Sequence, residues 1–173
     1  PSGKNTKNLS AEQEIKWQHK YSMLGLALSP VAAVFDQGPR NTDLLVSECA
    51  DISLRQYLQN MCLAHCRFTH EEKAQYLETC WRKLKHVLQV MYDHQLVHGD
   101  MHTDNIMLKF NRSDDDFTQE SDYRLVIIDF GKCSQGKRFQ HLDIIQLMRG
   151  MQTVNKDVMR FFDGKVRFWL KQH

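Results

Sequence analysis

Two short polar motifs, each beside an apolar run, place the strongest constraint on this chain. The first spans residues 98–105 (HGDMHTDN) and leads into the apolar residues 106–108, and the second, Asp-Phe-Gly at 129–131, follows the apolar residues 125–128. Short apolar runs rich in β-branched residues predict buried strands. The sequence therefore predicts a carboxylate on a loop, an amide five residues later, and a second carboxylate at the end of a buried strand.

The carboxylate of Asp100, the amide of Asn105 and the carboxylate of Asp129 are groups that phosphoryl transfer requires. A carboxylate and an amide oxygen can hold Mg²⁺, which neutralises phosphate charge, while another carboxylate orients the attacking hydroxyl. There is an alternative, because His98, Asp100 and His102 alternate along the chain and would share one face of an extended segment, as the ligands of a metallohydrolase do. That alternative gives no role to Asn105 or Asp129.

In order and spacing, the two motifs resemble those of the protein-kinase-like superfamily, whose catalytic loop reads H-R-D-x-x-x-x-N and whose metal loop reads D-F-G. The resemblance implies that Asp100 is the catalytic base and that His98 anchors the loop. It also implies that Asn105 and Asp129 hold Mg²⁺ and that ATP is the phosphoryl donor. The implied fold is α+β and bilobal, with a mostly helical large lobe that contains the catalytic β-hairpin.

Two positions in the catalytic loop depart from the regulated protein kinases. Gly99 stands where those kinases have an arginine that reads a phosphorylated loop, and no A-P-E sequence follows Asp-Phe-Gly, so we do not expect switching by phosphorylation there. His102 stands where many Ser/Thr kinases have lysine, and a protonated histidine can donate to a phosphate oxygen. We therefore group His102 with Asp100 and Asn105 as catalytic.

The sequence around His102 narrows the resemblance further. The pattern H-G-D-x-H-x-x-N is similar to the loop of aminoglycoside and choline phosphotransferases, and haspin has H-R-D-x-H-x-x-N. The compactness of the chain resembles the KEOPS-complex kinase, RIO-type kinases and small viral kinases. The resemblance therefore points to a compact, atypical type of kinase.

The N-terminal part predicts a helix followed by a β-hairpin. Ser10 begins a capping box, which predicts a helix to about residue 24, and residues 31–35 and 44–48 are β-prone runs joined by a turn-rich connection. This order resembles the kinase small lobe after its third strand. We expect residues 1–50 to form a partial small lobe and residues 51–173 to form the large lobe.

One acidic residue of the first predicted helix matches the kinase carboxylate that pairs with the ATP-positioning lysine. By its spacing Glu14 is the best match, Glu12 is the competitor, and a solvated surface glutamate is the alternative. The sequence contains no G-x-G-x-x-G loop, and Lys4 and Lys7 lie too close to Glu14 to be that lysine on its own strand. We therefore expect an N-terminal segment or a partner to complete the small lobe.

The resemblance also assigns a nucleotide site. Residues 48–51 match the hinge, whose backbone groups bind the adenine edge in the family, so Glu48 and Ala50 are expected at the nucleotide. Met107, on the strand after the catalytic loop, and Ile128, immediately before the metal loop, are expected there as well. The hinge assignment depends on register alone.

The large lobe is predicted to be mostly helical. A short helix is expected over residues 53–58, and a second capping box at residues 69–72 opens a long helix that leads to the catalytic loop. Apolar residues at helical spacing predict the buried face of that long helix: Tyr76, Cys80, Leu84, Val87, Leu88 and Met91.

Three further segments complete the large lobe. Residues 111–122 are polar and acidic and predict a surface loop between the two hairpin strands. A helix is expected from about His141, where Asp143 either bonds the backbone of the catalytic loop, as in the family, or is a first-turn aspartate favoured by the helix dipole. The tail predicts one more helix that closes the core with four aromatic residues: Phe161, Phe162, Phe168 and Trp169.

Composition excludes several classes of partner. The 173 residues are 42% hydrophobic, enough for one sizeable core, and the net charge of +2 comes from dispersed charges, so nucleic acid is not indicated. No apolar stretch approaches the roughly 18 residues that span a bilayer. Five cysteines, an odd number, suggest reduced thiols and an intracellular location, cytoplasmic or nuclear, or a viral protein inside a host cell. Cys62, His65, Cys66 and His70 cluster, but their spacing fits no common zinc site.

Three functions follow. The first is an ATP- and Mg²⁺-dependent Ser/Thr protein kinase of compact type. The second is a small-molecule kinase of the aminoglycoside or choline type, favoured by His102 and by the short segment after Asp129. The third is a pseudokinase or interaction module, favoured by the missing glycine-rich loop and lysine. In the first two the acceptor is a hydroxyl, on a protein or on a small molecule.

Overall fold

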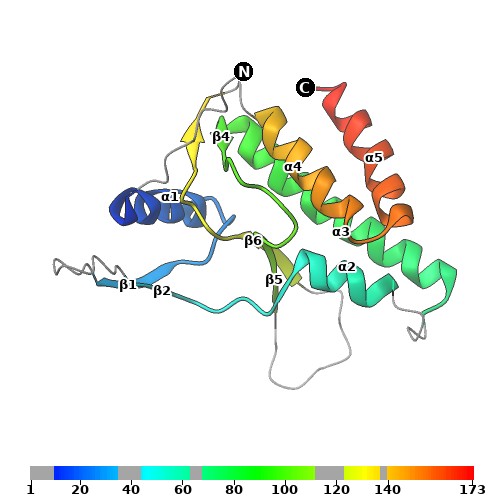
Figure 1. The fold of residues 1–173 in the computed structure, drawn as a ribbon, viewed down its shortest axis with the longest axis horizontal. Coiled ribbons are helices and arrows are strands. Elements are labelled where there is room, and N and C mark those ends of the chain that lie inside the picture. Colours follow the sequence, from blue (N-terminus) through cyan, green and yellow to red (C-terminus); the bar gives the residue numbers. More distant parts are fainter. Residues whose placement is uncertain (1–9, 35–43, 63–67, 112–122, 137–139) are drawn as a thin grey trace.

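The computed structural model describes residues 10–34, 44–62, 68–111, 123–136 and 140–173. Within these residues the chain is α+β, with five helices and three small antiparallel sheets (Figure 1). The helices are α1 (Ala11–Met23), α2 (Leu54–Cys62), α3 (His70–Asp93), α4 (Gln140–Gln152) and α5 (Lys156–Leu170). The strands are β1 (Pro30–Val34), β2 (Leu44–Ser47), β3 (Ile52–Ser53), β4 (Leu96–Val97), β5 (Ile106–Phe110), β6 (Tyr123–Ile127) and β7 (Ser134–Gln135).

Helix α1 begins and ends where the sequence predicts. The side chain of Ser10 accepts a hydrogen bond from the Gln13 backbone N–H, and the Gln13 side chain accepts one from the Ser10 N–H, so the predicted capping box is present. The helix is followed by Gly25, whose φ of +73° is readily adopted only by glycine. These two local signals fix the length of the helix.

The start of helix α3 is likewise fixed by hydrogen bonds between residues close in sequence. Glu72 N–H donates to the Thr69 hydroxyl at 3.2 Å, and Thr69 N–H donates to the Glu72 carboxylate at 2.7 Å. Five of the six predicted core residues of this helix are buried. Tyr76 is the exception. It is only half-buried and packs on the ring of Phe68 with centroids 5.0 Å apart, because it lies within the first two turns of the helix, next to its exposed start.

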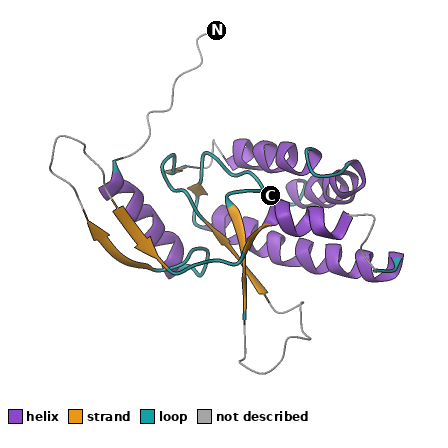
Figure 2. Cartoon of the chain, turned by 60° about the horizontal axis from the view of Figure 1, so that its bottom comes forward, coloured by secondary structure: helices purple, strands orange, loops and turns teal. Residues whose placement is uncertain are grey.

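Two of the sheets lie in different parts of the molecule (Figure 2). Strands β1 and β2 form the predicted antiparallel hairpin, which lies beside α1 on one side, while β3, β5 and β6 form a sheet in that order next to the helices of the other side. Ile127 N–H donates to Leu26 C=O at 2.7 Å, so the segment after α1 is attached to β6. The α+β class expected from the sequence is confirmed.

The last helix closes the core with one face. The side chains of Val158, Phe162, Val166 and Trp169 recur at helical spacing and are all buried. Phe168 was expected with them, and this prediction is wrong. Its side chain is 65% exposed, because the position next to Trp169 is rotated by about 100° around the helix.

Smaller differences between the predicted and the observed structure concern the residues at which helices and strands begin and end. Helix α2 begins at Leu54 and extends to Cys62, four residues beyond the predicted end, after a cap in which Gln56 N–H donates to the Ser53 hydroxyl at 3.1 Å. Ile128 lies beyond the end of β6 rather than inside the strand. Lys4, Lys7, His65, Cys66 and nearly all of the acidic loop lie outside the described residues.

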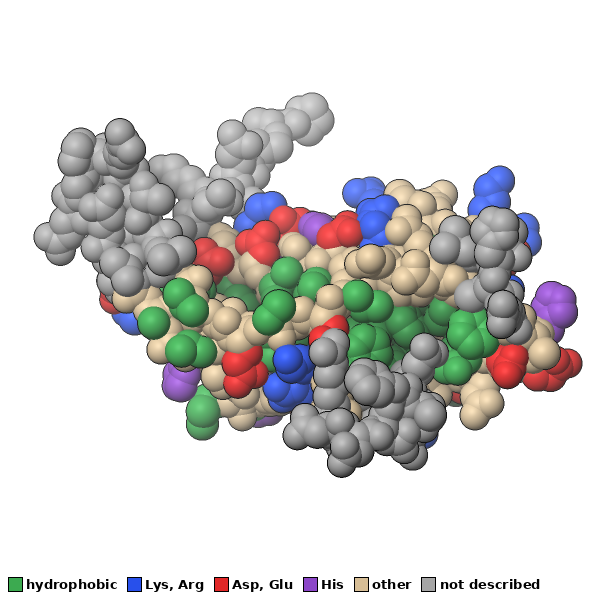
Figure 3. Space-filling view, turned by 90° about the horizontal axis from the view of Figure 1, so that it is seen from below, with side chains coloured by type: hydrophobic (Ala, Val, Ile, Leu, Met, Phe, Trp, Pro, Cys, Tyr) green, Lys and Arg blue, Asp and Glu red, His purple; other side chains and the backbone are tan. Residues whose placement is uncertain are grey.

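No helix of the described residues is long and apolar enough to cross a membrane. Figure 3 shows one face of the molecule, on which acidic and basic side chains are scattered along both margins of a band of apolar side chains. This mixture agrees with the dispersed charge of the sequence.

Candidate active site

The catalytic loop is held by two side chains of α4. Asp143 is 2% exposed, and its carboxylate accepts hydrogen bonds from the backbone N–H groups of His98 at 2.7 Å and Gly99 at 2.8 Å. This confirms the first of the two roles considered for Asp143. Burial raises the pKa of Asp143 to about 6, although the two N–H donors act in the opposite direction. One turn further on, Gln146 accepts from Met101 N–H at 2.9 Å and donates to Gly99 C=O at 3.1 Å.

His98 is a buried anchor of the loop. Its Nδ1 accepts from Asp100 N–H at 3.3 Å, so Nε2 carries the proton and donates to Ile128 C=O at 3.0 Å. Burial lowers its pKa, which favours the neutral ring. Both ring nitrogens are therefore engaged, and the metallohydrolase alternative, in which His98 is a metal ligand, is wrong.

Asn105 joins the two motifs. Its Nδ2 donates to Asp100 C=O at 3.0 Å, and its own C=O accepts from Ile128 N–H at 3.0 Å. Asn105 is 7% exposed, and within the described residues its Oδ1 has no hydrogen-bond partner. The residue before Asp129 is thus hydrogen-bonded to the catalytic loop, and a side-chain oxygen of that loop is available for a cation.

Asp129 and Glu14 lie close together. Asp129 adopts a φ of +63°, which is unusual for a residue other than glycine and is typical of a functional turn. Burial raises the pKa of Glu14, and the negative charge of Asp129 raises it further. The Phe130 N–H donates a hydrogen bond to the Glu14 carboxylate and acts in the opposite direction. Glu12, the competing residue, is exposed and pairs with Lys16 at 2.6 Å. The geometry therefore places Glu14, and not Glu12, beside the metal loop.

An aromatic cluster positions α1 against both motifs. The ring centroid of Tyr21 lies 5.0 Å from that of Phe130 and 6.4 Å from that of His98, and the rings of His98 and Phe130 are 5.7 Å apart. Tyr21 is fully buried. Because Tyr21 lies two helical turns after Glu14, this packing also directs Glu14 toward Asp129.

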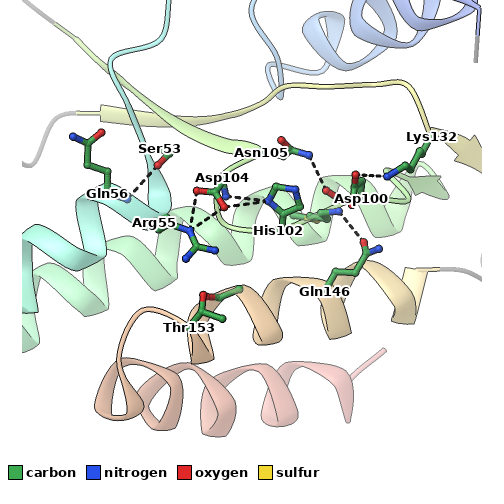
Figure 4. A network of polar contacts seen from close by, with 12 residues as sticks. Ser53, Arg55, Gln56, Asp100, His102, Asp104, Asn105, Lys132, Gln146 and Thr153 are labelled. Atoms are coloured by element: carbon green, nitrogen blue, oxygen red, sulfur yellow. Dashed lines mark hydrogen bonds and ion pairs between the residues drawn. The ribbon is translucent and has the colours of Figure 1, made fainter. Parts of the chain in front are cut away.

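The side chain of Lys132 meets Asp100. Its Nζ lies 2.5 Å from Asp100 Oδ2, with 35% of the lysine side chain and 24% of the aspartate side chain exposed (Figure 4). The backbone of Lys132 also passes close to Gly99, because a Cβ added to Gly99 would lie only 2.5 Å from the Lys132 carbonyl oxygen. Gly99 also has a φ of +80°. Glycine at this position is therefore explained by close backbone packing and by conformation.

His102 belongs to a second polar group, with Asp104 and Arg55. Arg55 Nε lies 2.8 Å from Asp104 Oδ1, and Asp104 Oδ2 lies 3.5 Å from Nδ1 of His102 (Figure 4). The Asp104 N–H donates to the same Nδ1 at 3.3 Å, which leaves Nε2 to carry the proton of the neutral ring. The ring is thereby oriented by Asp104 rather than by Asp100.

The expected nucleotide residues lie within or next to the sheet of β3, β5 and β6: Met107 is in β5, Ile128 follows β6, and Glu48 and Ala50 precede β3. Asp51 N–H donates to Leu108 C=O at 2.9 Å, which attaches the segment that contains Glu48 and Ala50 to β5. Glu48 is exposed, whereas Ala50, Met107 and Ile128 are half-buried. The structure joins Ile128 to the catalytic loop, and the nucleotide roles of these four residues stay predictions.

The residues present fit a divalent cation. Among the described residues no group of three or more His, Cys, Asp or Glu side chains is arranged to hold a metal ion. Mg²⁺ bound to a nucleotide needs fewer protein ligands, because phosphate oxygens and water supply the rest. The Oδ1 of Asn105 is available, and the carboxylate of Asp129 is exposed. The pKa of the neighbouring Glu14 is raised in part by the charge of Asp129, so a cation would stabilise this acidic site.

Comparison with known proteins identifies the family. Residues 51–162 match the ABC1 atypical kinase-like domain. The chain belongs to this family. Among solved structures, WaaP in complex with acyl carrier protein matches with a TM-score of 0.59 at 13% identity, over 96% of this chain and 75% of that chain. At this identity the match shows the fold alone. No curated protein matches the chain.

The ABC1 kinase-like match covers only part of the candidate site. It contains Asp100, Asn105 and Asp129, whereas Glu14 lies before it. The kinase-like resemblance drawn from the two motifs is thereby confirmed, and the individual catalytic and metal-binding roles stay predictions.

Four residues of the ABC1 kinase-like site were missed by the sequence reasoning. Gln146 lies three residues after Asp143, on the same face of α4, and this spacing is a signal that was available. Tyr21 lies seven residues after Glu14, again on one helix face. Lys132 directly follows Asp-Phe-Gly but matches no family motif, and Arg55 carries no local signal at all.

Proposed function

We propose that this chain is an ATP- and Mg²⁺-dependent phosphotransferase whose acceptor is a hydroxyl group. The observation that carries the proposal is the direct attachment of the two motifs, through Asn105, with Asp100 on one side and Asp129 on the other. A scaffold that fixes a base and two cation ligands on adjacent loops provides the positioning that dominates this chemistry.

Each residue of the proposed mechanism has a separate task. Asn105 and Asp129 would hold Mg²⁺, which would supply charge neutralisation for the transferred phosphoryl group. Asp100 accepts the proton of the acceptor hydroxyl, and we assign to Glu14 the pairing with a lysine that positions ATP. His102 can donate a hydrogen bond to a phosphate oxygen from Nε2.

We propose a compact Ser/Thr protein kinase as the first acceptor class. A small-molecule kinase is the second candidate, and one observation favours it: β7 follows Gly131 after two residues, and α4 begins at residue 140, which leaves a short segment where peptide substrates bind in protein kinases. The two classes differ only in the acceptor, so a single assay separates them.

The experiment is phosphoryl transfer from labelled ATP, with and without Mg²⁺, to a panel of proteins and of small-molecule alcohols. Label in protein indicates the first class, and label in a small alcohol indicates the second. Asp100→Asn is expected to reduce kcat by about 10²–10⁴-fold with ATP binding retained. Asp157→Asn, which alters an exposed carboxylate on α5, is the matched control. Full activity of Asp100→Asn would refute the proposal, and a chain that binds ATP without turnover would be a pseudokinase.

We further propose that residues 1–50 are part of a small lobe that an upstream segment or a protein partner completes. Strands β1 and β2 form a two-stranded sheet, with Val31 68% and Val46 42% exposed, and such sheets are marginal alone. WaaP was solved in complex with acyl carrier protein, so a protein of this fold binds another protein. A chain to which a glycine-rich strand pair with a lysine is fused before Pro1 should bind ATP more tightly, and equal affinity would argue against this proposal.

We propose an intracellular location. Three cysteines of the described residues, Cys49, Cys80 and Cys133, are free thiols. Reduced thiols are typical of intracellular proteins. Thiol titration of the native and the denatured chain, after purification without reductant, tests this assignment.

A further inference from the structure

The ion pair between Lys132 and Asp100 is not explained by the two motifs themselves. The Nζ–Oδ2 distance is 2.5 Å, and both side chains are largely shielded from solvent. Partial burial reduces screening by water and salt, so this pair is stronger than an exposed one. In the part of the chain that the structure describes, Lys132 is the cation in contact with Asp100.

The backbone around Lys132 is fixed on both sides. Cys133 N–H donates to Phe130 C=O at 3.2 Å, which closes a tight turn over residues 130–133 around Lys132. After it, β7 pairs with β4, and Gly136 N–H donates to Gln95 C=O at 2.9 Å. The position of Lys132 is therefore set by the same strand that leads into the catalytic loop.

The close approach of the Lys132 backbone requires glycine at residue 99. The Lys132 carbonyl oxygen occupies the space that a Cβ on residue 99 would need. Any larger residue at 99 would separate the two segments and move the ammonium group away from Asp100. The glycine and the lysine thus form one structural unit that spans both motifs.

The contacts of Asp100 leave one oxygen available. Its N–H donates to His98 Nδ1, its C=O accepts from Asn105 Nδ2, and its Oδ2 accepts from Lys132. Within the described residues Oδ1 has no partner. A carboxylate fixed by one oxygen presents the other in a defined direction.

We propose that Lys132 is a positioning residue for phosphoryl transfer, which holds Asp100 Oδ2 so that Oδ1 faces the acceptor hydroxyl. The inference rests on the proposed function. The ring of His102, at the position where many Ser/Thr kinases have lysine, is oriented by Asp104, so the cation at the base comes from the metal loop instead.

The proton balance of the step requires no further group. The acceptor O–H bond breaks as its oxygen bonds to the γ-phosphorus, and the bond to the leaving ADP oxygen breaks. The proton moves to Asp100 Oδ1, while Lys132 stays protonated throughout and transfers nothing. Lys132 therefore acts through Asp100 and not on the substrate.

The first test is a double-mutant cycle on kcat. Lys132→Met is expected to lower kcat by about 10²-fold, the size of a misplaced catalytic group, with KM for ATP unchanged. Lys132→Arg should recover part of kcat. In the Asp100→Asn background, Lys132→Met should cause no further loss. An equal loss in both backgrounds, or a raised KM for ATP with kcat unchanged, would overturn the inference.

The matched control is Lys165→Met. Lys165 pairs with Glu78 at 2.5 Å, and its side chain is 33% exposed, so distance and exposure closely match those of Lys132. Lys165 lies on α5 and Glu78 lies on α3, so this pair joins two helices and has no described contact with the two motifs. Lys165→Met should leave kcat at the wild-type value.

The second test does not depend on activity. The melting temperatures of the chains carrying Lys132→Met, Asp100→Ala and both should be non-additive, because the two side chains are in contact. If the melting temperatures are non-additive but the wild-type chain shows no turnover, the proposed function is overturned. The positioning role of Lys132 falls with it, and the pair is then structural. Turnover without coupling would overturn only the inference about Lys132.

Discussion

The carbonyl oxygen of Lys132 lies 2.5 Å from the point that a Cβ of Gly99 would occupy, so the metal loop and the catalytic loop touch backbone to backbone. Gly99 also has a φ of +80°. We expect Gly99→Ala to lower the free energy of unfolding by about 1–3 kcal/mol, because the substitution adds both a clash and backbone strain. Chemical denaturation measures this change, and kcat should fall as well.

Gly164→Ala provides the control for that substitution. Gly164 lies within α5, and a Cβ there meets nothing within 4 Å. Alanine should therefore raise the free energy of unfolding by roughly 0.5–1 kcal/mol through its helix propensity. Equal effects of the two substitutions would contradict the close approach of Lys132 to Gly99.

Asp143 should make the stability of the chain depend on pH. Its pKa in the folded state, about 6, lies above its ordinary value of 3.8, so the folded state binds the proton more tightly than the unfolded state. The contribution is fully present below pH 3.8 and is lost as the pH rises to about 6. The difference in unfolding free energy between wild type and Asp143→Asn should therefore fall by on the order of 3 kcal/mol across this range.

Denaturation at several pH values between 4 and 7 tests the role of Asp143. Asp157→Asn serves as the control, because the side chain of Asp157 is 85% exposed on α5. A difference between wild type and Asp143→Asn that does not change with pH would show that burial leaves this carboxyl group unperturbed.

Glu14 and Glu12 should behave differently although they lie two residues apart. Glu14 faces Asp129 and Phe130, whereas Glu12 pairs with Lys16 on the surface. If Glu14 contributes to the nucleotide site, Glu14→Gln should weaken binding of Mg²⁺-ATP by about tenfold, which is about 1.4 kcal/mol. Isothermal titration calorimetry measures the dissociation constant. Glu12→Gln should leave the affinity unchanged, and identical affinities for both variants would remove Glu14 from the site.

Gln146 should stabilise the catalytic loop. Its side chain makes two hydrogen bonds to that loop, one with Met101 and one with Gly99. Gln146→Ala leaves those backbone groups without partners and should cost about 1–3 kcal/mol of unfolding free energy, with a lower kcat. Gln152→Ala, at the exposed end of the same helix, is the control. A loss of stability that is equal in both variants would assign the effect to the helix and not to the loop.

The sequence by itself determined those features that depend on residues close along the chain. The capping boxes at Ser10 and Thr69 are hydrogen bonds between residues three apart, so the starts of α1 and α3 could be predicted. The fixed spacing between Asp100 and Asn105, and the apolar run before Asp129, likewise indicated the kinase-like loops. Such signals are local, because a turn or a short strand forms within a few residues.

Only the tertiary structure decided which distant groups meet. Whether Glu12 or Glu14 faces the metal loop depends on how Tyr21 packs on Phe130, and the role of Asp143 depends on contacts across more than 40 residues. The pair of Lys132 with Asp100 spans 32 residues, and no local pattern encodes it. The physical reason is that packing of the core, rather than the period of any segment, sets the distance between residues far apart in the sequence.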